Sequence, residues 1–579
     1  MGIQRGWLVL AVSYGLFCCL HDGFAQAIPQ VDLNVIQKQQ DEIQRRNETD
    51  RRLLELKNKS GAKTHPQEIA PPEFPSLPEG ETCFQADVIE LKGVTLLDED
   101  EQAELLNPYL GQCITLKNVD ELLRAITNLY SEKGYVTSRG FVPSQDISDG
   151  SLELVIIEGF IEGYELHDDK SRKTWRLKSA FPLTLDRPLN LRDIEQGLDQ
   201  MNRLQSNNAS MKLEPGSVQG ATLVRIDNQS SKPWHFTSGY DNSGSIATGV
   251  QQWSGTAALD DLLGVNDYLS FSWSKDTKAG DPQQSRSLSG YWSIPLGYLT
   301  LSGSHSFYSH ASKINATTAS YISSGYSRSQ KVELDWVVAR DQDSKTNTSV
   351  FLRQHTAASF INEEKLVSSS YRLTSLGWTL GYQDKLWGGI GSINGTVEKG
   401  IRALWAKEDI GITDPSTPRA QFLKSELDLS YYKPFEVAAQ KLTYQGTAHA
   451  QWSPQTLYST NQISIGGLSS VRGYKEHTLG GDQGAYLQNT LSWALPQTGY
   501  EIPDKLFGIF SPFVGYDIGA LENDAKDNSE KGVISGYAFG LKTSGGLLNL
   551  SATYARPIRT PAHLDERHHE LHLKMEVSF

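Results

Sequence analysis

Apolar and polar residues alternate without exception in the stretch Leu571-His572-Leu573-Lys574-Met575-Glu576-Val577-Ser578-Phe579. Successive side chains of a β-strand point to opposite faces, so this stretch predicts a strand with one apolar and one polar face. Similar alternation recurs at 269–274, 332–336 and 423–431. Beyond Pro233 no helical periodicity survives, and Gly, Asn, Asp, Ser and Pro separate the runs. We therefore predict that residues 234–579 are all β.

A closed barrel in a membrane explains this segment better than a soluble sandwich, although a sandwich also alternates. Within each run the charged residues keep to one face, as expected when the other face contacts lipid, where a Lys or Arg costs roughly 2 to 4 kcal/mol at the midplane. Only 38% of the residues are hydrophobic, which is too few for membrane helices, while Gly (50), Tyr (24) and Trp (12) are plentiful. At roughly 20 to 22 residues per strand with its connection, the segment predicts about sixteen strands.

The connections between these strands are expected to differ in length at the two ends of the barrel. Residues 294–297 form a short Pro-Gly connection, whereas 306–329 are polar and are predicted to form a long loop. Short turns on one side and long loops on the other are typical of outer-membrane barrels.

The first residues predict export from the cytoplasm. Residues 1–27 are typical of a signal peptide, with Arg5, an apolar core over 7–20 and a cleavage site at Ala25-Gln26-Ala27. Two cysteines then remain, Cys83 and Cys113, and an oxidising compartment favours a disulfide between them. It would close a loop of about thirty residues and contribute roughly 3 to 4 kcal/mol. Metal ligation and a redox pair are the alternatives, although no CxxC spacing or nearby His cluster favours them.

Two segments separate the signal from the first folded unit. Residues 28–60 are rich in Gln, Glu, Arg and Lys and can be helical, but the helix would be polar on every side. Such a helix lies in water or in a polar cavity, so both a solvated spacer and a pore plug remain open. Residues 61–81 hold five prolines and are predicted to be an extended linker.

Two small α+β units are predicted next, at 82–160 and 161–233, with the shared order strand, helix, helix, strand, strand. In the first, strands are expected at 84–91, 136–142 and 152–158. Its helices begin at the capping boxes Asp98/Glu101 and Asn118/Glu121. In the second, strands are expected at 163–167, 210–214 and 221–227. A helix lies around Trp175, and another covers 191–204.

Two motifs of the barrel segment are separated by about forty residues. The first is Val471-Arg472-Gly473-Tyr474, within the long segment 452–483 between strand-like runs. The second is the strand Phe513–Gly519, in which Phe513, Gly515, Asp517 and Gly519 share a face. Small glycines beside a carboxylate leave room for another side chain. On these residues alone, Arg472 capping a surface loop and Asp517 lining a pore is the simpler alternative.

With these motifs the chain resembles the outer-membrane transporters of two-partner secretion, of the haemolysin-activator and filamentous-haemagglutinin-transporter type. The resemblance covers nearly the whole mature chain and also includes Gly134–Arg139, Ser144–Gly150, Met201–Leu204 and Pro215-Gly216. It implies that the two small units are polypeptide-transport-associated (POTRA) domains and that residues 28–60 are the pore plug. It also implies that Arg472 pairs with Asp517 inside the lumen, and that Phe579 belongs to the signal for insertion by the barrel-assembly machinery.

The implied function is secretion of an unfolded exoprotein, which is a haemolysin, an adhesin or a contact-dependent inhibition toxin. The protein would sit in outer-membrane lipid with its front domains in the periplasm. An insertase for other barrels and a passive porin are the alternatives from other classes.

Other functions are not indicated by the sequence. The net charge of −14 offers no footprint for nucleic acid. No GxxxxGK[ST] or GxSxG motif indicates a nucleotide site or a hydrolase, so we expect no catalytic residues and no cofactor. His568, Glu570 and His572 share one face, but His569–His572 is one residue short of HExxH, so we expect no metal site.

Overall fold

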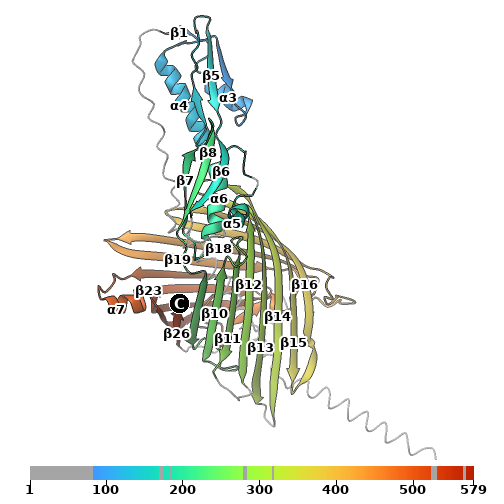
Figure 1. Cartoon of the computed structure of the whole chain (residues 1–579). Helices are drawn as coiled ribbons and strands as arrows, with labels where there is room; N and C mark the ends of the chain where they lie inside the picture. Colours follow the sequence, from blue (N-terminus) through green and yellow to red (C-terminus); the bar gives the residue numbers. More distant parts are fainter. Residues whose placement is uncertain are drawn as a thin grey trace, which may run out of the picture.

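The computed structural model describes residues 83–167, 174–182, 184–277, 283–315, 319–522, 531–564 and 569–579. In Figure 1 two small domains follow one another along the chain and stand on one end of a large barrel. We call them front domain 1 (83–159) and front domain 2 (160–228). The barrel end that touches front domain 2 is the near end, and the opposite end is the far end. The signal peptide (1–27), plug helix (28–60) and linker (61–81) expected from the sequence lie outside the described residues.

Front domain 1 is a sheet in the order β2-β5-β4 covered by helices. The elements are β1 (Phe84–Gln85), β2 (Val88–Lys92), α3 (Glu99–Leu106), β3 (Cys113–Ile114), α4 (Leu116–Glu132), β4 (Arg139–Phe141) and β5 (Ser151–Ile157). Leu122, Ile126 and Tyr130 of α4 are fully buried against the sheet. A disulfide joins Cys83 to Cys113, with the two Cα atoms 5.4 Å apart.

Three details of this domain differ from the sequence-based expectation. The single strand expected at 84–91 is divided into β1, which pairs with β3, and β2, which pairs with β5. The helix expected to start at the Asn118/Glu121 box begins earlier, at Leu116, because the Thr115 side chain caps it and pairs with Asn118. The Asp98/Glu101 box does cap α3. The strand expected at 136–142 is only Arg139–Phe141, because Val136 packs instead against the core of front domain 2.

Front domain 2 repeats the arrangement with a sheet in the order β6-β8-β7. Its elements are β6 (Phe160–His167), α5 (Thr174–Ala180), α6 (Leu191–Asn202), β7 (Ala209–Pro215) and β8 (Ala221–Asn228). Asn190 caps α6, whose apolar face buries Ile194, Leu198 and Met201. On its other face α6 carries the polar side chains that meet the barrel.

Sixteen strands of the described residues close into one barrel. They are β9 (Trp234–Asp241), β10 (Gln252–Asp260), β11 (Tyr268–Asp276), β12 (Gln284–Leu296), β13 (Leu299–Asn315), β14 (Ser320–Arg340), β15 (Lys345–Ile361), β16 (Glu364–Leu386), β17 (Gly389–Gly400), β18 (Leu423–Val437), β19 (Gln440–Trp452), β22 (Gln483–Ala494), β23 (Gly508–Glu522), β24 (Gly532–Gly545), β25 (Leu548–Arg559) and β26 (Glu570–Ser578). Neighbours are antiparallel, and β26 pairs with β9 to close the ring.

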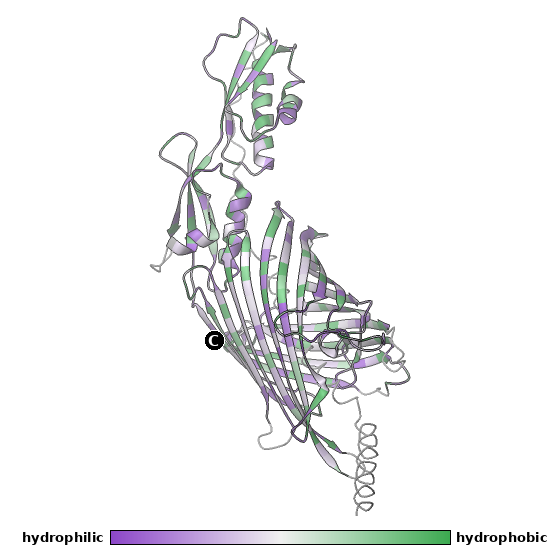
Figure 2. Cartoon of the chain, turned by 90° about the vertical axis from the view of Figure 1, so that its right-hand side faces the viewer, coloured by the Kyte–Doolittle hydropathy of each residue, from purple (hydrophilic) through white to green (hydrophobic). Residues whose placement is uncertain are grey.

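The outer surface of the barrel is apolar and the inner surface is polar. Outward side chains such as Trp273, Leu334 and Val514 are exposed by 44 to 57%, and Figure 2 shows hydrophobic residues along the barrel strands. Residues of the opposite parity, such as Glu333 and Asp517, point inward. In the described part of the chain no helix has the length and apolarity to cross a membrane.

The prediction of a long loop at 306–329 is wrong. Both flanks of this stretch are strand: β13 runs to Asn315 and β14 starts at Ser320. The many serines suggested a loop, but small polar side chains suit a strand that is paired on both sides and faces a polar interior. The long connections at this end are instead 401–422 and 453–482. The short connection at 294–297 does end in a tight turn, at Gly297.

Front domain 2 is tied to the near end of the barrel by polar contacts. The turn carbonyl of Gly297 accepts hydrogen bonds from the side chains of Gln196 (3.1 Å) and Gln200 (2.8 Å), both buried. Arg203 donates to the Asn266 carbonyl in the next turn (2.7 Å). Arg340, at the end of β14, pairs with Asp199 (2.6 Å). These contacts hold α6 against the barrel mouth.

One carboxylate joins the loop after β2 to helix α4 in front domain 1. Glu158 accepts hydrogen bonds from the amides of Thr95 (2.7 Å) and Leu96 (2.9 Å), from the Tyr130 hydroxyl (2.7 Å) and from the Thr95 hydroxyl. Burial alone would raise the pKa of the Glu158 carboxyl, but the hydrogen bonds outweigh it and hold the pKa below its usual value. The charged form is therefore favoured by folding.

We predict that Glu158→Gln lowers the free energy of unfolding of front domain 1 by about 1–2 kcal/mol at pH 7, because an amide replaces one acceptor oxygen with a donor. Because the pKa of Glu158 is lower in the folded than in the unfolded protein, the carboxylate stabilises the wild type fully above the unfolded pKa, near 4.3. This stabilisation is lost as the pH falls through the lower folded pKa. The Glu158→Gln variant should not show this pH-dependent loss of stability. Protease susceptibility of residues 83–159 in the full chain between pH 7 and pH 3 measures both effects.

The matched control is Glu153→Gln, on the adjoining strand β5, whose exposed pair with Lys92 contributes little. Equal susceptibility of the Glu158 and Glu153 variants at pH 7 would contradict the prediction.

Candidate functional site: a loop anchored inside the barrel

The connection between β19 and β22 folds back onto the inner wall of the barrel. It contains η1 (Ser459–Asn461) and a hairpin of β20 (Ile463–Ile465) and β21 (Leu479–Gly481). Apolar side chains of this loop are fully buried against Leu521 of β23 and Ile534 of β24; they are Ile463, Ile465, Val471 and Tyr474. The loop at 453–482 is therefore a packed element, which we call the inner loop.

Arg472 is the polar anchor of the inner loop. Its Nε donates to Oδ2 of Asp517 (2.6 Å) and its Nη2 to Oδ1 (2.7 Å), which is a bidentate pair. The Arg472 amide also donates to Asp517 (3.1 Å), and Nη2 donates to the Asn489 carbonyl of β22 (2.8 Å). Asp517 is 0% exposed and Arg472 is 6% exposed. Removing one partner would leave the other charge buried and unpaired, which costs about 3–5 kcal/mol.

Glycines of the wall make room for this pair. A Cβ at Gly515 would lie 2.2 Å from Nη2 of Arg472, and a Cβ at Gly519 would lie 2.5 Å from Ile465. On the neighbouring strand, a Cβ at Gly536 would lie 2.2 Å from the Arg472 carbonyl oxygen. Gly515 and Gly536 therefore make room for Arg472, whereas Gly519 makes room for the apolar side chains of Ile465 and Val471. Gly536 is a position that strand parity alone did not single out.

The other residues of the Val-Arg-Gly-Tyr motif fix the path of the loop. Val471 packs beside Gly519. Gly473 has φ +100°, a conformation that side chains disfavour, and a Cβ at this position would lie 2.9 Å from the Arg556 carbonyl carbon and 3.0 Å from the Pro557 nitrogen. The buried Tyr474 hydroxyl donates to the Arg559 carbonyl at the end of β25 (2.6 Å). The motif thus touches β22, β23, β24 and β25.

Two further residues, Lys475 and Glu476, carry the inner loop across the seam where the barrel closes. Lys475 donates through Nζ to the Asn242 carbonyl, next to β9 (2.6 Å), and through its amide to Glu570 of β26. Glu476 accepts from the Ser245 hydroxyl (2.9 Å). At the base of the loop, buried Asp482 accepts from the Leu457 amide (3.0 Å) and the Gln462 side chain (3.0 Å).

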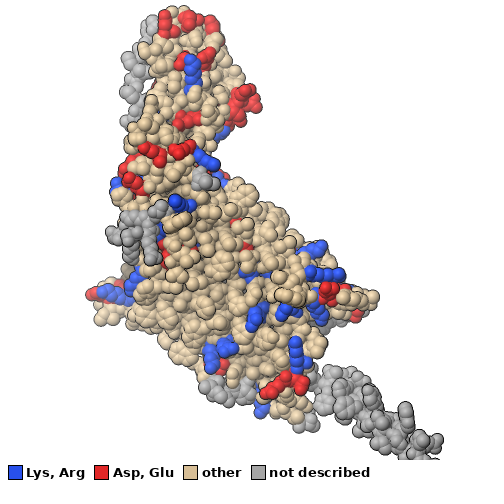
Figure 3. Space-filling view, turned by 45° about the vertical axis from the view of Figure 1, so that its right-hand side comes forward, with Lys and Arg blue, Asp and Glu red and all other residues tan. Residues whose placement is uncertain are grey.

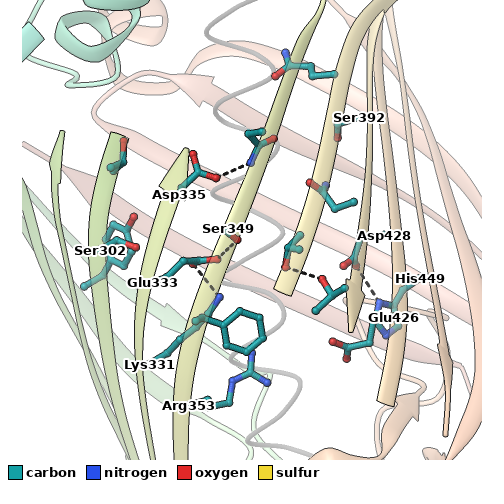
Figure 4. A pocket seen from close by; sticks show the side chains of 18 of the residues that line it. Ser302, Lys331, Glu333, Asp335, Ser349, Arg353, Ser392, Glu426, Asp428 and His449 are labelled. Atoms are coloured by element: carbon teal, nitrogen blue, oxygen red, sulfur yellow. Dashed lines mark hydrogen bonds and ion pairs between the residues drawn. The ribbon is translucent and has the colours of Figure 1, made fainter. Parts of the chain in front are cut away.

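Along strands β15 to β19 the lumen wall carries a network of alternating charges that sequence reasoning did not single out, and it lines the same cavity as residues 460–462 of the inner loop. Glu398, fully buried, pairs with Arg353 (3.0 Å) and Lys424 (3.3 Å), and Lys424 also pairs with Glu426 (3.1 Å). Asp428 pairs with His449 (2.9 Å). In Figure 4 Glu333 and Asp335 of β14 face the same space as Glu426, Asp428 and His449. Inward parity of charged residues on neighbouring strands was the available signal.

The remaining predicted residues lie away from this site. The Cys83–Cys113 disulfide is in front domain 1. Phe579 lies at the near end, where its ring stacks with that of Phe236 (6.3 Å between centroids) and its amide donates to the Phe236 carbonyl (2.9 Å). His568 lies outside the described residues, and His572 bonds Glu570 within the strand (3.0 Å). Among the described residues no group of three His, Cys, Asp or Glu side chains could hold a metal ion.

We predict that Gly515→Ala releases the inner loop, because the added methyl displaces the Arg472 guanidinium from Asp517. Proteolysis of residues 453–482 in the folded protein should become roughly tenfold faster or more. The matched control is Gly395→Ala in β17, where an added Cβ meets nothing within 4 Å. Barrel folding is checked for both by the heat-dependent shift in gel mobility. Equal protection of the loop in the two variants would refute the role of Gly515.

Comparison with known proteins agrees with this architecture. Residues 220–543 match the family described as "Haemolysin secretion/activation protein ShlB/FhaC/HecB". Residues 84–159 match the POTRA domain of ShlB type, and residues 160–215 match a POTRA domain.

Relatives are similar over most of their length. The outer membrane transporter CdiB of Dickeya dadantii (strain 3937) is 33% identical, covering 96% of each chain. The hemolysin transporter protein ShlB of Serratia marcescens is 31% identical over 73% of this chain and 74% of its own. The solved structure of CdiB from Escherichia coli matches with a TM-score of 0.84 and 30% identity, covering 96% of this chain and 99% of that one. The chain therefore belongs to the haemolysin secretion/activation family of outer-membrane transporters, with POTRA domains in front of its barrel.

Proposed function

We propose that this transporter captures an unfolded partner exoprotein in the periplasm and secretes it through its own barrel, the client being a haemolysin, an adhesin or a contact-dependent inhibition toxin. The observation that carries the proposal is the closed barrel with a charged lumen whose near end is joined directly to a POTRA domain. A wet, charged wall suits an extended polypeptide, whose backbone groups stay hydrogen-bonded to water and polar side chains.

The free edge of the front domain 2 sheet is the proposed capture site. In the order β6-β8-β7, both β6 and β7 are edges. The β6 edge is partly covered, because the Ile161 amide donates to the Arg187 carbonyl (3.0 Å) and the Asp186 amide to the Ile161 carbonyl (2.9 Å). Among the described residues no strand covers β7 on its outer side. An extended client can add to such an edge through backbone hydrogen bonds without requiring particular side chains.

The docking of front domain 2 fixes the position of this edge relative to the barrel mouth. Arg340, Gln196 and Gln200 join α6 to the barrel turns, and α6 packs on the same sheet that carries β7. A client strand on β7 would thus be held near the mouth at a fixed orientation, which raises its effective concentration there.

The anchored inner loop is proposed to hold the lumen in a defined shape during passage. The Arg472–Asp517 pair and the apolar packing of Val471 and Tyr474 keep the loop against β22–β25. Export also requires the proposed plug at 28–60 to leave the pore, and we expect pore conductance once it has done so. Because no nucleotide is present in the periplasm, client folding outside the cell is the proposed drive.

The route of this protein to the membrane is proposed from its first 27 residues and its last residue. Residues 1–27 act as the signal peptide, and the barrel-assembly machinery inserts the chain into outer-membrane lipid, recognising Phe579 at the end of β26. No catalytic residue is assigned, since the proposed work is binding and passage.

We predict that a photo-crosslinking residue at Lys212, exposed on β7, captures the client during export. The same residue at Glu162, exposed on β6 beside the covered Ile161, is the matched control and should crosslink at least severalfold less. The measurement is the yield of transporter–client adduct in cells that export normally. Equal yields at the two edges would rule out β7 as the capture edge.

We predict that Arg472→Ala lowers export roughly tenfold or more while membrane insertion is largely retained, because buried Asp517 loses its partner. Arg472→Lys should recover only part of the export, since an ammonium cannot make the bidentate pair. The control Lys574→Ala removes another inward cation, one whose pair with Glu576 is partly exposed. Surface client is measured relative to folded transporter. Unchanged export in the Arg472→Ala variant would show that the anchor is dispensable.

A further inference from the structure

On the outer surface of the barrel, two arginines flank one aromatic ring. Arg286 of β12 and Arg328 of β14 lie over the ring of Phe307, on β13 between them, at 5.6 Å and 5.9 Å from its centroid. Both arginines are exposed, and their chain neighbours Ser285, Ser327 and Ser329 are buried on the inner side. The two guanidinium groups therefore point away from the lumen.

The position of this cluster along the strands places it at the outer border of the membrane. On β12 the outward apolar positions run from Leu296 to Leu288, and the next outward residue is Arg286. Eight residues of strand span about 26 Å, or roughly 20 Å along the membrane normal at the usual tilt, close to the height of the apolar band of such barrels. On β14 the same band runs from Val338 to Val332, and the next outward residues are Gln330 and then Arg328. Arg286 lies toward the far end, away from the periplasmic front domains.

The cluster carries positive charge, and none of the described carboxylates pairs with its arginines. Within the described residues neither Arg286 nor Arg328 forms an ion pair, and a third cation, Lys275, stands directly opposite Arg286 in the sheet. On the face shown in Figure 3, Lys and Arg are prominent over the barrel, while Asp and Glu are prominent on the front domains. Like charges held together at a membrane border repel one another unless an anion lies between them.

Aromatic rings continue from the cluster on the same outer face. Phe307 stacks with Tyr326 (6.2 Å between centroids), and Tyr326 lies 6.4 Å from Phe360. Such rings offer a flat surface for the sugar and upper acyl chains of a glycolipid, while guanidinium groups bind phosphate in bidentate fashion.

We propose that Arg286 and Arg328, with Lys275 beside them, bind a phosphate of the anionic glycolipid that forms the outer leaflet, with Phe307 and Tyr326 contacting its sugar. The ring of Phe307 holds the two guanidinium groups from neighbouring strands at a common height. The site fixes the transporter in the outer leaflet and is separate from the lumen and the inner loop.

The test uses the full chain purified in detergent and the double variant Arg286→Gln/Arg328→Gln. Native mass spectrometry measures binding of bisphosphorylated lipid A, of the same lipid without phosphates, and of inorganic phosphate. The matched control is Lys433→Gln/Lys441→Gln, which removes the same charge at the periplasmic end of β18 and β19. The heat-dependent gel shift confirms that each barrel is folded, and Arg286→Lys/Arg328→Lys replaces the glutamine variant if the latter fails to fold.

The wild type and the Lys433→Gln/Lys441→Gln control should bind bisphosphorylated lipid A equally. The arginine double variant should bind it roughly tenfold or more weakly, as expected for losing two cations near an anionic surface. The Arg286→Lys/Arg328→Lys variant should also bind more weakly than wild type, because it keeps the charge but loses bidentate geometry. The proposal is overturned if the arginine and control variants bind alike, if removing the lipid phosphates changes nothing, or if inorganic phosphate binds as well as the lipid.

Discussion

Every backbone N–H and C=O group of a membrane-spanning strand must find a partner within the protein, because the hydrocarbon core supplies none. In this chain that requirement is met by pairing β26 with β9, which leaves the barrel without an edge. Closure also fixes the direction of every side chain: one parity contacts lipid and the other faces the lumen. The charged wall, the anchored loop and the outer arginine cluster all follow from that assignment.

Within the lumen, the stability of the inner loop depends on a buried ion pair that only a shaped wall permits. Arg472 reaches Asp517 because Gly515 and Gly536 provide space where any other residue would collide. A desolvated charge pair is favourable only when its geometry is good and its remaining hydrogen-bonding groups are satisfied. Here the Asn489 carbonyl and the Arg472 amide complete the set. The loop is thereby held in one place by an ion pair in which the loss of either partner alone is costly.

The two front domains have the same order of elements but different relations to the barrel. Front domain 2 is bound to the turns through Gln200, Arg203 and Arg340, while front domain 1 meets it through Val136 and the Gly134 carbonyl, which accepts from the Leu191 amide. The domain that bears the free edge of β7 is thus also the one fixed at the mouth. This arrangement suits the transfer of an extended chain from a sheet edge into a pore.

The sequence by itself determined the elements whose signals are local. Alternation of period two predicted the barrel and which face of Leu571–Phe579 meets lipid, and side-chain chemistry predicted the Asp98 cap and suggested a Cys83–Cys113 bridge. Other features depended on partners distant in the chain, and only the tertiary structure decided them. Serines at 306–329 form strand because neighbours pair with them on both sides, and Glu398 is tolerated because Arg353 and Lys424 arrive from other strands. The physical reason is the same in each case: the free energy of a polar group is set by what surrounds it, and those surroundings exist only once the barrel has closed.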